Sequence, residues 1–117
     1  DRPRPTVASG RGAVYDFEID AATHARLAEI AQQTGASEFM VVHAAFAVLL
    51  ARLAATDDVT IGTPVAGRGE RELDALIGMF VNTLVLRTHV DIGSSFTALL
   101  DEVKDADLAA FAHAELP

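Results

Sequence analysis

Ile77-Gly78-Met79-Phe80-Val81-Asn82-Thr83-Leu84-Val85-Leu86-Arg87 is the stretch of this 117-residue chain that says most about its fold. Apolar residues surround one amide and one guanidinium here, and residues 80–90 form the longest predicted strand. Asn82 and Arg87 point to opposite faces of that strand, because side chains alternate along it, so they cannot both line one pocket. Each needs hydrogen-bond partners or faces a cavity. Taken alone, the stretch favours a structural role for both.

Two helices are predicted before this strand. Asp20 is the expected N-cap of the first helix, which ends at Gly35, and Ser37 is the expected N-cap of the second. The second helix reaches Leu53 and is apolar around nearly its whole circumference, so we expect it to be buried on most sides. The segment before both helices, residues 14–19, alternates and predicts a half-exposed strand.

A second strand and a third helix complete the predicted fold. Val59-Thr60-Ile61-Gly62-Thr63 alternates as a strand whose further pairing Pro64 limits, and residues 73–77 are expected to form a short helical turn. The predicted order is therefore β-α-α-β-β-α. Helices packed on a small mixed sheet give an α/β lobe of the two-layer, α+β kind. The apolar stripe of the last helix consists of Phe96, Leu99, Leu100, Val103 and Ala106.

Composition excludes several classes of function. The formal net charge is −8, which argues against a nucleic-acid binder because phosphate neutralisation needs clustered Lys and Arg. The chain has no cysteine, so disulfides and thiolate nucleophiles are excluded. The absence of cysteine fits a reducing cytosol, so a cytoplasmic location is expected. No apolar run reaches the length of a membrane span and no signal peptide is visible. A start at Asp1 and an end at Pro117 look like cuts in a longer polypeptide.

Catalytic chemistry has little support in the residues alone. No Gly-x-Ser-x-Gly motif is present, and a triad could assemble only from distant parts of the chain. His43 lies on the apolar helix, where a neutral imidazole bonded to a carbonyl is expected. The spacing of the histidines makes a metal site improbable, and the glycine-rich residues 62–69 lack the end of a phosphate-binding loop. The four histidines are His24, His43, His89 and His113.

Four segments resemble, in the right order, the condensation domains of nonribosomal peptide synthetases. The first, with its Leu49-Leu50-Ala51-Arg52 end, resembles the long helix of the family's C-terminal lobe. The third resembles the fifth core motif almost letter for letter. The last resembles the start of the sixth motif, with His113-Ala114-Glu115 in place of the usual His-Gln-Asp. The four segments are residues 34–53, 57–68, 76–87 and 110–117.

The resemblance implies a fold like that of chloramphenicol acetyltransferase, with two lobes forming a V and a tunnel between them. Residues 1–12 would be the inter-lobe linker and residues 13–117 part of the C-terminal lobe. The family's His-His-x-x-x-Asp-Gly motif belongs to the other lobe and does not occur in this sequence. The chain is therefore expected to supply no catalytic residue. It would bind no cofactor directly, because the phosphopantetheine arms of carrier proteins enter the tunnel as tethered substrates.

By the same resemblance, this chain supplies the wall and floor of the tunnel. Asn82 is expected to lie nearest the substrate or pantetheine. Arg87 would anchor the lobe through a buried carboxylate or carbonyl, and Arg68 would hold the turn after the earlier strand. The expected partners are peptidyl carrier proteins, the N-terminal lobe and an adjacent adenylation domain. The other residues expected beside the tunnel are Gly78, Phe80 and Thr83.

Other functions are compatible with the same motifs. One is a related enzyme of the same fold: an epimerisation domain, a cyclisation domain, or a carrier-independent acyltransferase. Another is a non-catalytic interaction lobe whose exposed surface is covered by a second copy. The active-site motif would discriminate among the enzymes, since cyclisation domains carry aspartates in place of its histidines.

Overall fold

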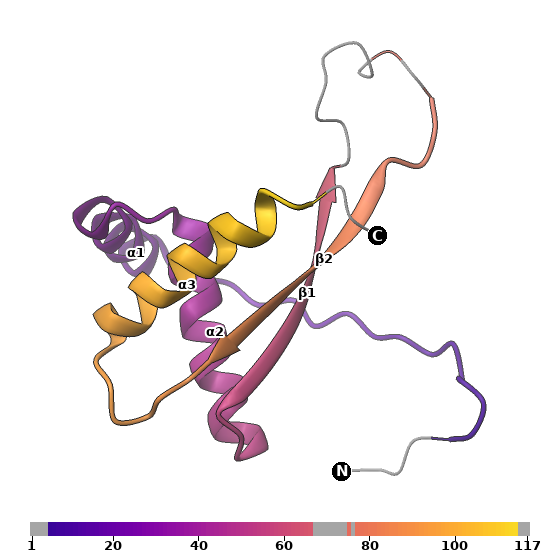
Figure 1. Ribbon diagram of the computed structural model, residues 1–117, viewed down its shortest axis with the longest axis horizontal. Helices are drawn as coiled ribbons and strands as arrows, with labels where there is room; N and C mark the ends of the chain where they lie inside the picture. The colour runs from indigo at the N-terminus through magenta and orange to yellow at the C-terminus, as the bar shows by residue number, and fades with distance from the viewer. Residues whose placement is uncertain (1–4, 67–74, 76, 115–117) are drawn as a thin grey trace.

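The computed structural model describes residues 5–66, 75 and 77–114, which contain three α-helices and one antiparallel pair of strands (Figure 1). The helices gather on one side, and the strands extend beyond them as a long twisted pair. The sheet is antiparallel rather than mixed. The elements are α1 (Ala21–Thr34), α2 (Glu38–Ala54), β1 (Asp58–Ala66), β2 (Val81–His89) and α3 (Phe96–Phe111).

The strand predicted at residues 14–19 is absent from this structure. The described sheet contains only β1 and β2, and the segment before α1 is extended without being part of it. Val14 and Tyr15 are 87% and 88% exposed, respectively. The prediction of a strand is therefore wrong, because alternation alone does not make a strand, which also needs a neighbouring strand with which to exchange hydrogen bonds. The observed order is α-α-β-β-α.

Local capping signals place the helix boundaries as the sequence predicted. The Asp20 carboxylate accepts a hydrogen bond from the Thr23 amide at 2.9 Å, and Gly35 ends α1 with φ of +64°. The Ser37 hydroxyl accepts a hydrogen bond from the Met40 amide at 3.2 Å and begins α2. These confirm Asp20 and Ser37 as N-caps and Gly35 as the residue that stops α1.

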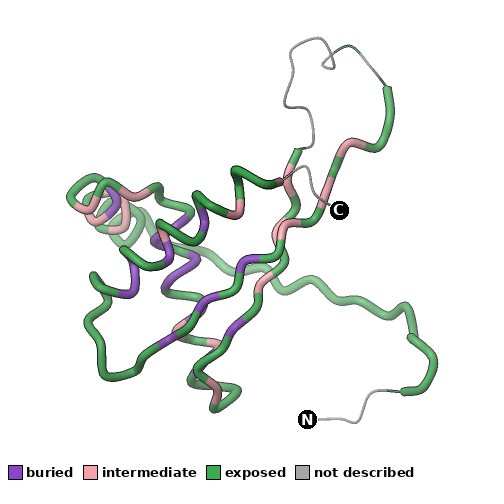
Figure 2. Tube along the Cα trace, viewed as in Figure 1, coloured by how far each residue is buried: buried purple, intermediate pink, exposed green. Residues whose placement is uncertain are grey.

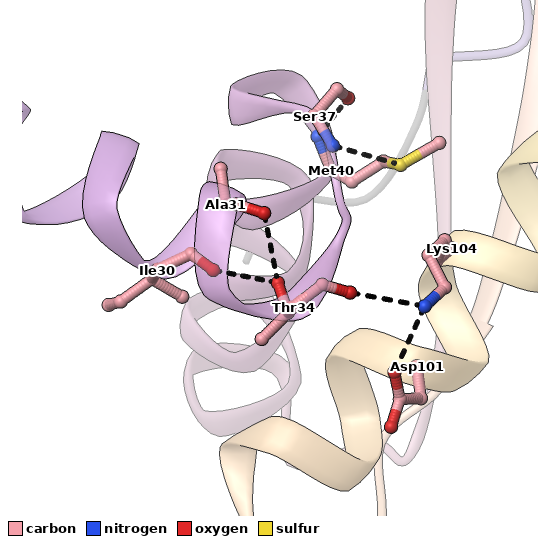
Figure 3. Close-up of polar contacts among 7 residues, drawn as sticks. All are labelled: Ile30, Ala31, Thr34, Ser37, Met40, Asp101 and Lys104. Carbon is pink, nitrogen blue, oxygen red and sulfur yellow. Dashed lines mark hydrogen bonds and ion pairs between the residues drawn. The ribbon is translucent and has the colours of Figure 1, made fainter.

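A lysine ties α3 to the end of α1 (Figure 3). Lys104 Nζ donates to the Thr34 carbonyl at 3.3 Å and lies 3.2 Å from Asp101 Oδ1. The Thr34 carbonyl is one of the unsatisfied groups at the end of α1, where the helix dipole favours a cation. The contact joins residues of two helices that are 70 positions apart in sequence.

Helix α2 forms the centre of the core, but only one of its faces is covered. Its alanines at 44, 47 and 51 are at most 1% exposed, which allows close approach of neighbouring elements. The opposite face is open, and Leu49 and Leu53 are 51% and 76% exposed. The prediction that α2 is buried on most sides is therefore wrong for this chain. Figure 2 shows burial gathered where the helices meet the sheet. The outward apolar residues of α2 are Phe39, Val42, Phe46, Leu49 and Leu53.

Helix α3 packs through Leu99, Leu100 and Val103, as its predicted stripe required. After Val103 the buried stripe departs from the prediction, because Ala106 is exposed and Asp107 is buried. Positions 100, 103 and 107 follow the helical repeat and lie on one face. The predicted place of Ala106 on this stripe is therefore corrected, and an acidic side chain occupies the core position.

β2 is one residue shorter at each end than the predicted strand over residues 80–90, and β1 is longer than the predicted strand over residues 59–63. β1 continues past Pro64 to Ala66, and the register pairs Asp58 with His89 and Ala66 with Val81. Along β2 the even-numbered residues 82–88 are buried or half-buried and the odd-numbered residues are exposed. The predicted turn at residues 73–77 lies mostly outside the described residues.

Candidate functional site

Asn82 lies on the inner face of β2, near the start of the strand, and is half-buried. Its Nδ2 donates a hydrogen bond to the Ala114 carbonyl at 3.0 Å, just beyond the end of α3. Its Oδ1 accepts a hydrogen bond from the Thr83 amide at 2.9 Å. The carboxamide is thus held by backbone groups on both sides. A single amide joins β2 to the end of α3 and has a defined orientation.

The other residues predicted beside the tunnel lie within four positions of Asn82 in sequence. Phe80 is half-buried, and its ring covers Gly78, where an added Cβ would lie only 3.2 Å from the ring. Thr83 is exposed on the outer face. Ile77 and Met79 are 103% and 94% exposed, so the approach to β2 presents apolar side chains to solvent. The Phe80 ring therefore lies against Gly78 in the segment before β2, and Thr83 lies on the other face of the strand from Asn82.

Arg87 lies on the opposite face of β2 from Asn82, as the alternation predicted. Its Nε and Nη2 donate to Asp58 Oδ1 and Oδ2 at 2.9 and 2.7 Å, a bidentate pair between β2 and β1. The side chains are 74% and 44% exposed. These hydrogen bonds lower the pKa of the Asp58 carboxyl and raise the pKa of Arg87. The predicted carboxylate partner exists, but it is exposed rather than buried. Arg68 lies outside the described residues.

A buried chain of polar side chains around His43 was not predicted from the sequence. Nδ1 of this imidazole lies 3.0 Å from Asp107 Oδ2, and Nε2 lies 3.3 Å from Thr88 Oγ1. The His43 and Asp107 side chains are only 3% and 1% exposed. The expected backbone carbonyl is replaced by a carboxylate and a hydroxyl. The three residues come from α2, α3 and β2 and assemble from distant parts of the chain.

The atoms follow the order of a hydroxyl–imidazole–carboxylate relay, yet the surroundings do not suit catalysis. In such relays the hydroxyl must reach a bound substrate. Thr88 is 5% exposed, and neither Thr88 nor Asp107 borders the cavity that His43 touches. The chain of hydrogen bonds therefore links three elements inside the core.

A cavity of about 620 Å³ lies against the open face of α2. The His43 ring reaches its edge, and the extended N-terminal segment contributes Tyr15 and Phe17. Phe39 also borders the cavity, and its ring centroid lies 6.1 Å from the rings of both His43 and Phe111. The lining is almost wholly apolar. It consists of Tyr15, Phe17, Phe39, Val42, His43, Ala45, Phe46, Leu49, Ile61, Gly62, Thr63 and Leu86.

The remaining histidines have ordinary surroundings. His24 lies 3.0 Å from Glu38 on an exposed surface, and His113 Nδ1 lies 2.9 Å from the Ala109 carbonyl. His89 is exposed at the end of β2. Among residues 5–66, 75 and 77–114, no three His, Asp or Glu side chains gather closely enough to hold a metal ion. Within the same described part, no single helix is long and apolar enough to cross a membrane, and α1 with α2 reach that length only as a pair bent by 107°.

The model of the condensation-domain family matches residues 1–117, which is the whole chain. The chain belongs to the condensation-domain family. A probable non-canonical nonribosomal peptide synthetase, CymA, of Salinispora arenicola (strain CNS-205) is 49% identical over all of this chain and 2% of its own length.

Two solved structures resemble this condensation-domain chain closely. The X-domain from teicoplanin biosynthesis is 34% identical with a TM-score of 0.91, over 100% of this chain and 26% of that one. A four-domain nonribosomal peptide synthetase, holo-AB3403 bound to AMP and glycine, is 29% identical with a TM-score of 0.92, over 99% of this chain and 9% of that one. The predicted α/β class and chloramphenicol-acetyltransferase-like lobe are confirmed by these neighbours and by solved condensation domains.

The chain spans only a small part of the curated synthetases that it matches, 2% of one and 5% of another. Within it, the residues of the fifth core motif divide into two sets. The inner face of β2 carries Asn82, the segment before the strand carries Gly78 and Phe80, and the outer face carries Arg87, which pairs with Asp58.

Proposed function

We propose that this chain is part of a condensation domain that forms a peptide bond between a carrier-bound aminoacyl or peptidyl donor and a carrier-bound aminoacyl acceptor. Residues 1–12 would connect the two lobes, and residues 13–117 would form part of the C-terminal lobe. The chain would supply the wall and floor of the substrate tunnel. The histidines that assist attack of the acceptor amine on the donor thioester would come from the N-terminal lobe.

The observation that carries this proposal is the Asn82 amide on the inner face of β2. The chain that holds it matches the condensation-domain family over its whole length. Backbone groups hold the carboxamide on both sides, so its orientation does not depend on substrate. The nearby Ile77 and Met79 side chains are almost fully exposed. A pantetheine arm carries amides on an aliphatic chain, and this combination of a fixed amide and apolar side chains suits it.

The proposed role is positioning. Aminolysis of a thioester between two tethered groups depends on holding the amine against the carbonyl. Holding them together raises their effective molarity, and this is the main source of the rate gain. Phosphopantetheine is accordingly a tethered substrate here and no resident cofactor. The partners would be peptidyl carrier proteins, the N-terminal lobe and a neighbouring adenylation domain, all in the cytoplasm.

Asn82→Ala in a complete condensation domain tests the proposal. We expect condensation between cognate loaded carriers to fall by about ten- to hundredfold, because a misplaced reactant loses effective molarity. Arg87→Gln is the matched control on the other face of the same strand, and it should affect stability more than turnover. An Asn82→Ala domain that stays folded and condenses at the wild-type rate would rule out the tunnel-side role.

A further inference from the structure

The buried chain Thr88–His43–Asp107 joins α2 to β2 and α3, the two elements that also meet at Asn82. His43 comes from the covered face of α2, Thr88 from the inner face of β2 and Asp107 from the core face of α3. Thr88 and His43 are 5% exposed and Asp107 is 1% exposed. Among the described residues, Asp107 Oδ1 has no hydrogen-bond partner, so His43 is the one described group that bonds this carboxylate.

A buried polar chain of this kind constrains geometry more than it adds stability. Burying a carboxylate is costly unless it is paired, and apolar replacements of such pairs are often neutral or stabilising. The pairing holds only when α2, β2 and α3 keep one relative arrangement, since both imidazole nitrogens are used. Thr88 and Asp107 therefore fix how α3 lies against β2.

The same two elements meet again at Asn82. Asn82 and Thr88 share the inner face of β2, and Asn82 reaches the Ala114 carbonyl at 3.0 Å. Ala114 lies in the turn that follows α3, and its amide donates a hydrogen bond to the Phe111 carbonyl at 3.3 Å, so the position of Ala114 depends on where the end of α3 lies. A rotation of α3 that broke the Asp107 contact would also carry away the carbonyl that holds the Asn82 amide.

We propose that Thr88, His43 and Asp107 are positioning residues that set the orientation of the Asn82 carboxamide through α3. The expected effect on condensation rests on the proposed function, whereas the expected effect on the orientation of the Asn82 amide does not. The three residues do not touch substrate. They act through Asn82, so their effect on condensation should disappear when Asn82 is removed.

Kinetics in a complete condensation domain supply one test. The test variants Thr88→Val and Asp107→Leu each remove a polar group at similar volume. The controls are Thr88→Ser, which keeps the hydroxyl, and His24→Gln, which alters an exposed His–acid pair of the same 3.0 Å length. We expect kcat to fall about tenfold in Thr88→Val and Asp107→Leu with little change in KM, and to stay near wild type in the other two variants. In an Asn82→Ala background the same substitutions should have no further effect on kcat. Fully additive losses would overturn the inference.

A measurement that does not use activity separates this inference from the proposed function. Asn82 is the only asparagine of the 117 residues, so ¹⁵N-asparagine labelling of this chain gives one side-chain amide pair. That resonance should shift in Thr88→Val and Asp107→Leu and stay in place in Thr88→Ser and His24→Gln. An unmoved resonance in the folded variants would overturn the inference. A moved resonance together with a fully active Asn82→Ala domain would support the positioning network and contradict the proposed function. If one of the labelled variants fails to fold, the kinetic cycle between Asn82→Ala and the variant that still folds, Thr88→Val or Asp107→Leu, decides, and additive losses overturn the inference.

Discussion

His43 on α2 and Asp107 on α3 form a buried pair, with Nδ1 and Oδ2 3.0 Å apart and 64 residues between them in sequence. This pair, with Thr88, is the polar centre of an otherwise aliphatic core. On the same inner face of β2, Asn82 connects the strand to the residue that follows α3. The part of the chain that resembles the fifth core motif is therefore braced from inside the lobe.

The isolated chain is expected to show no condensation of carrier-bound substrates. It carries no His-His-x-x-x-Asp-Gly motif, and the proposed role of its residues is to position substrates rather than to transfer protons. The measurement is product formation with loaded carriers, with a complete condensation domain as the positive control. Turnover by the pure chain would contradict the assignment of the chemistry to the other lobe.

Acid should weaken the Asp58–Arg87 pair. The bidentate hydrogen bonds lower the pKa of Asp58 in the folded protein below its unfolded value of about 3.9. Its contribution to stability is therefore present above that unfolded pKa and is lost as the pH falls through the folded pKa. The free energy of unfolding, measured between about pH 6 and pH 2, should depend less on pH in Asp58→Asn than in the wild type.

Arg87→Gln is the matched variant for this pair, since it removes the partner and leaves the carboxylate. It should flatten the same acidic part of the stability profile. Wild-type, Asp58→Asn and Arg87→Gln profiles that run parallel below pH 5 would show that the pair does not shift the titration of Asp58.

Leu100 should be among the most costly core residues to truncate. Its side chain is 1% exposed between α3 and the rest of the core, and Leu100→Ala would leave a cavity as well as lose apolar contact. We expect a loss of about 2–5 kcal/mol in the free energy of unfolding by denaturant. Leu108→Ala on the same helix is the control, because Leu108 is 57% exposed. Equal losses in both variants would contradict the placement of the α3 stripe.

Gly35 should be sensitive to alanine for a conformational reason alone. Its φ is +64°, and no atom lies within 4 Å of an added Cβ, so strain in the left-handed region is the whole penalty. Gly35→Ala should lower the free energy of unfolding by about 1–2 kcal/mol. Gly12 also has open space around an added Cβ but no positive φ, so Gly12→Ala should be neutral. A neutral Gly35→Ala would argue against the left-handed end of α1.

The exposed apolar face of α2 explains why one sequence prediction failed. A helix that is apolar on nearly all sides signals burial, and here the face of Phe39, Phe46 and Leu49 borders a cavity instead. Periodicity states that an apolar face needs a cover but not which part of a protein supplies it. The unpaired segment before α1 is a similar case, because alternation indicates extended backbone and pairing requires another strand.

The sequence by itself determined the local features of this protein. Asp20, Ser37 and Gly35 set the helix ends because capping depends on residues within one turn, and alternation placed Asn82 and Arg87 on opposite faces of β2. Its ordered motifs also indicated the family that the whole-chain match confirms. Only the tertiary structure decided the partners of the polar residues. Asp107 reads in sequence as one more acid on α3, and its pairing with His43 follows from how α2 and α3 pack, which depends on contacts between residues far apart in the chain.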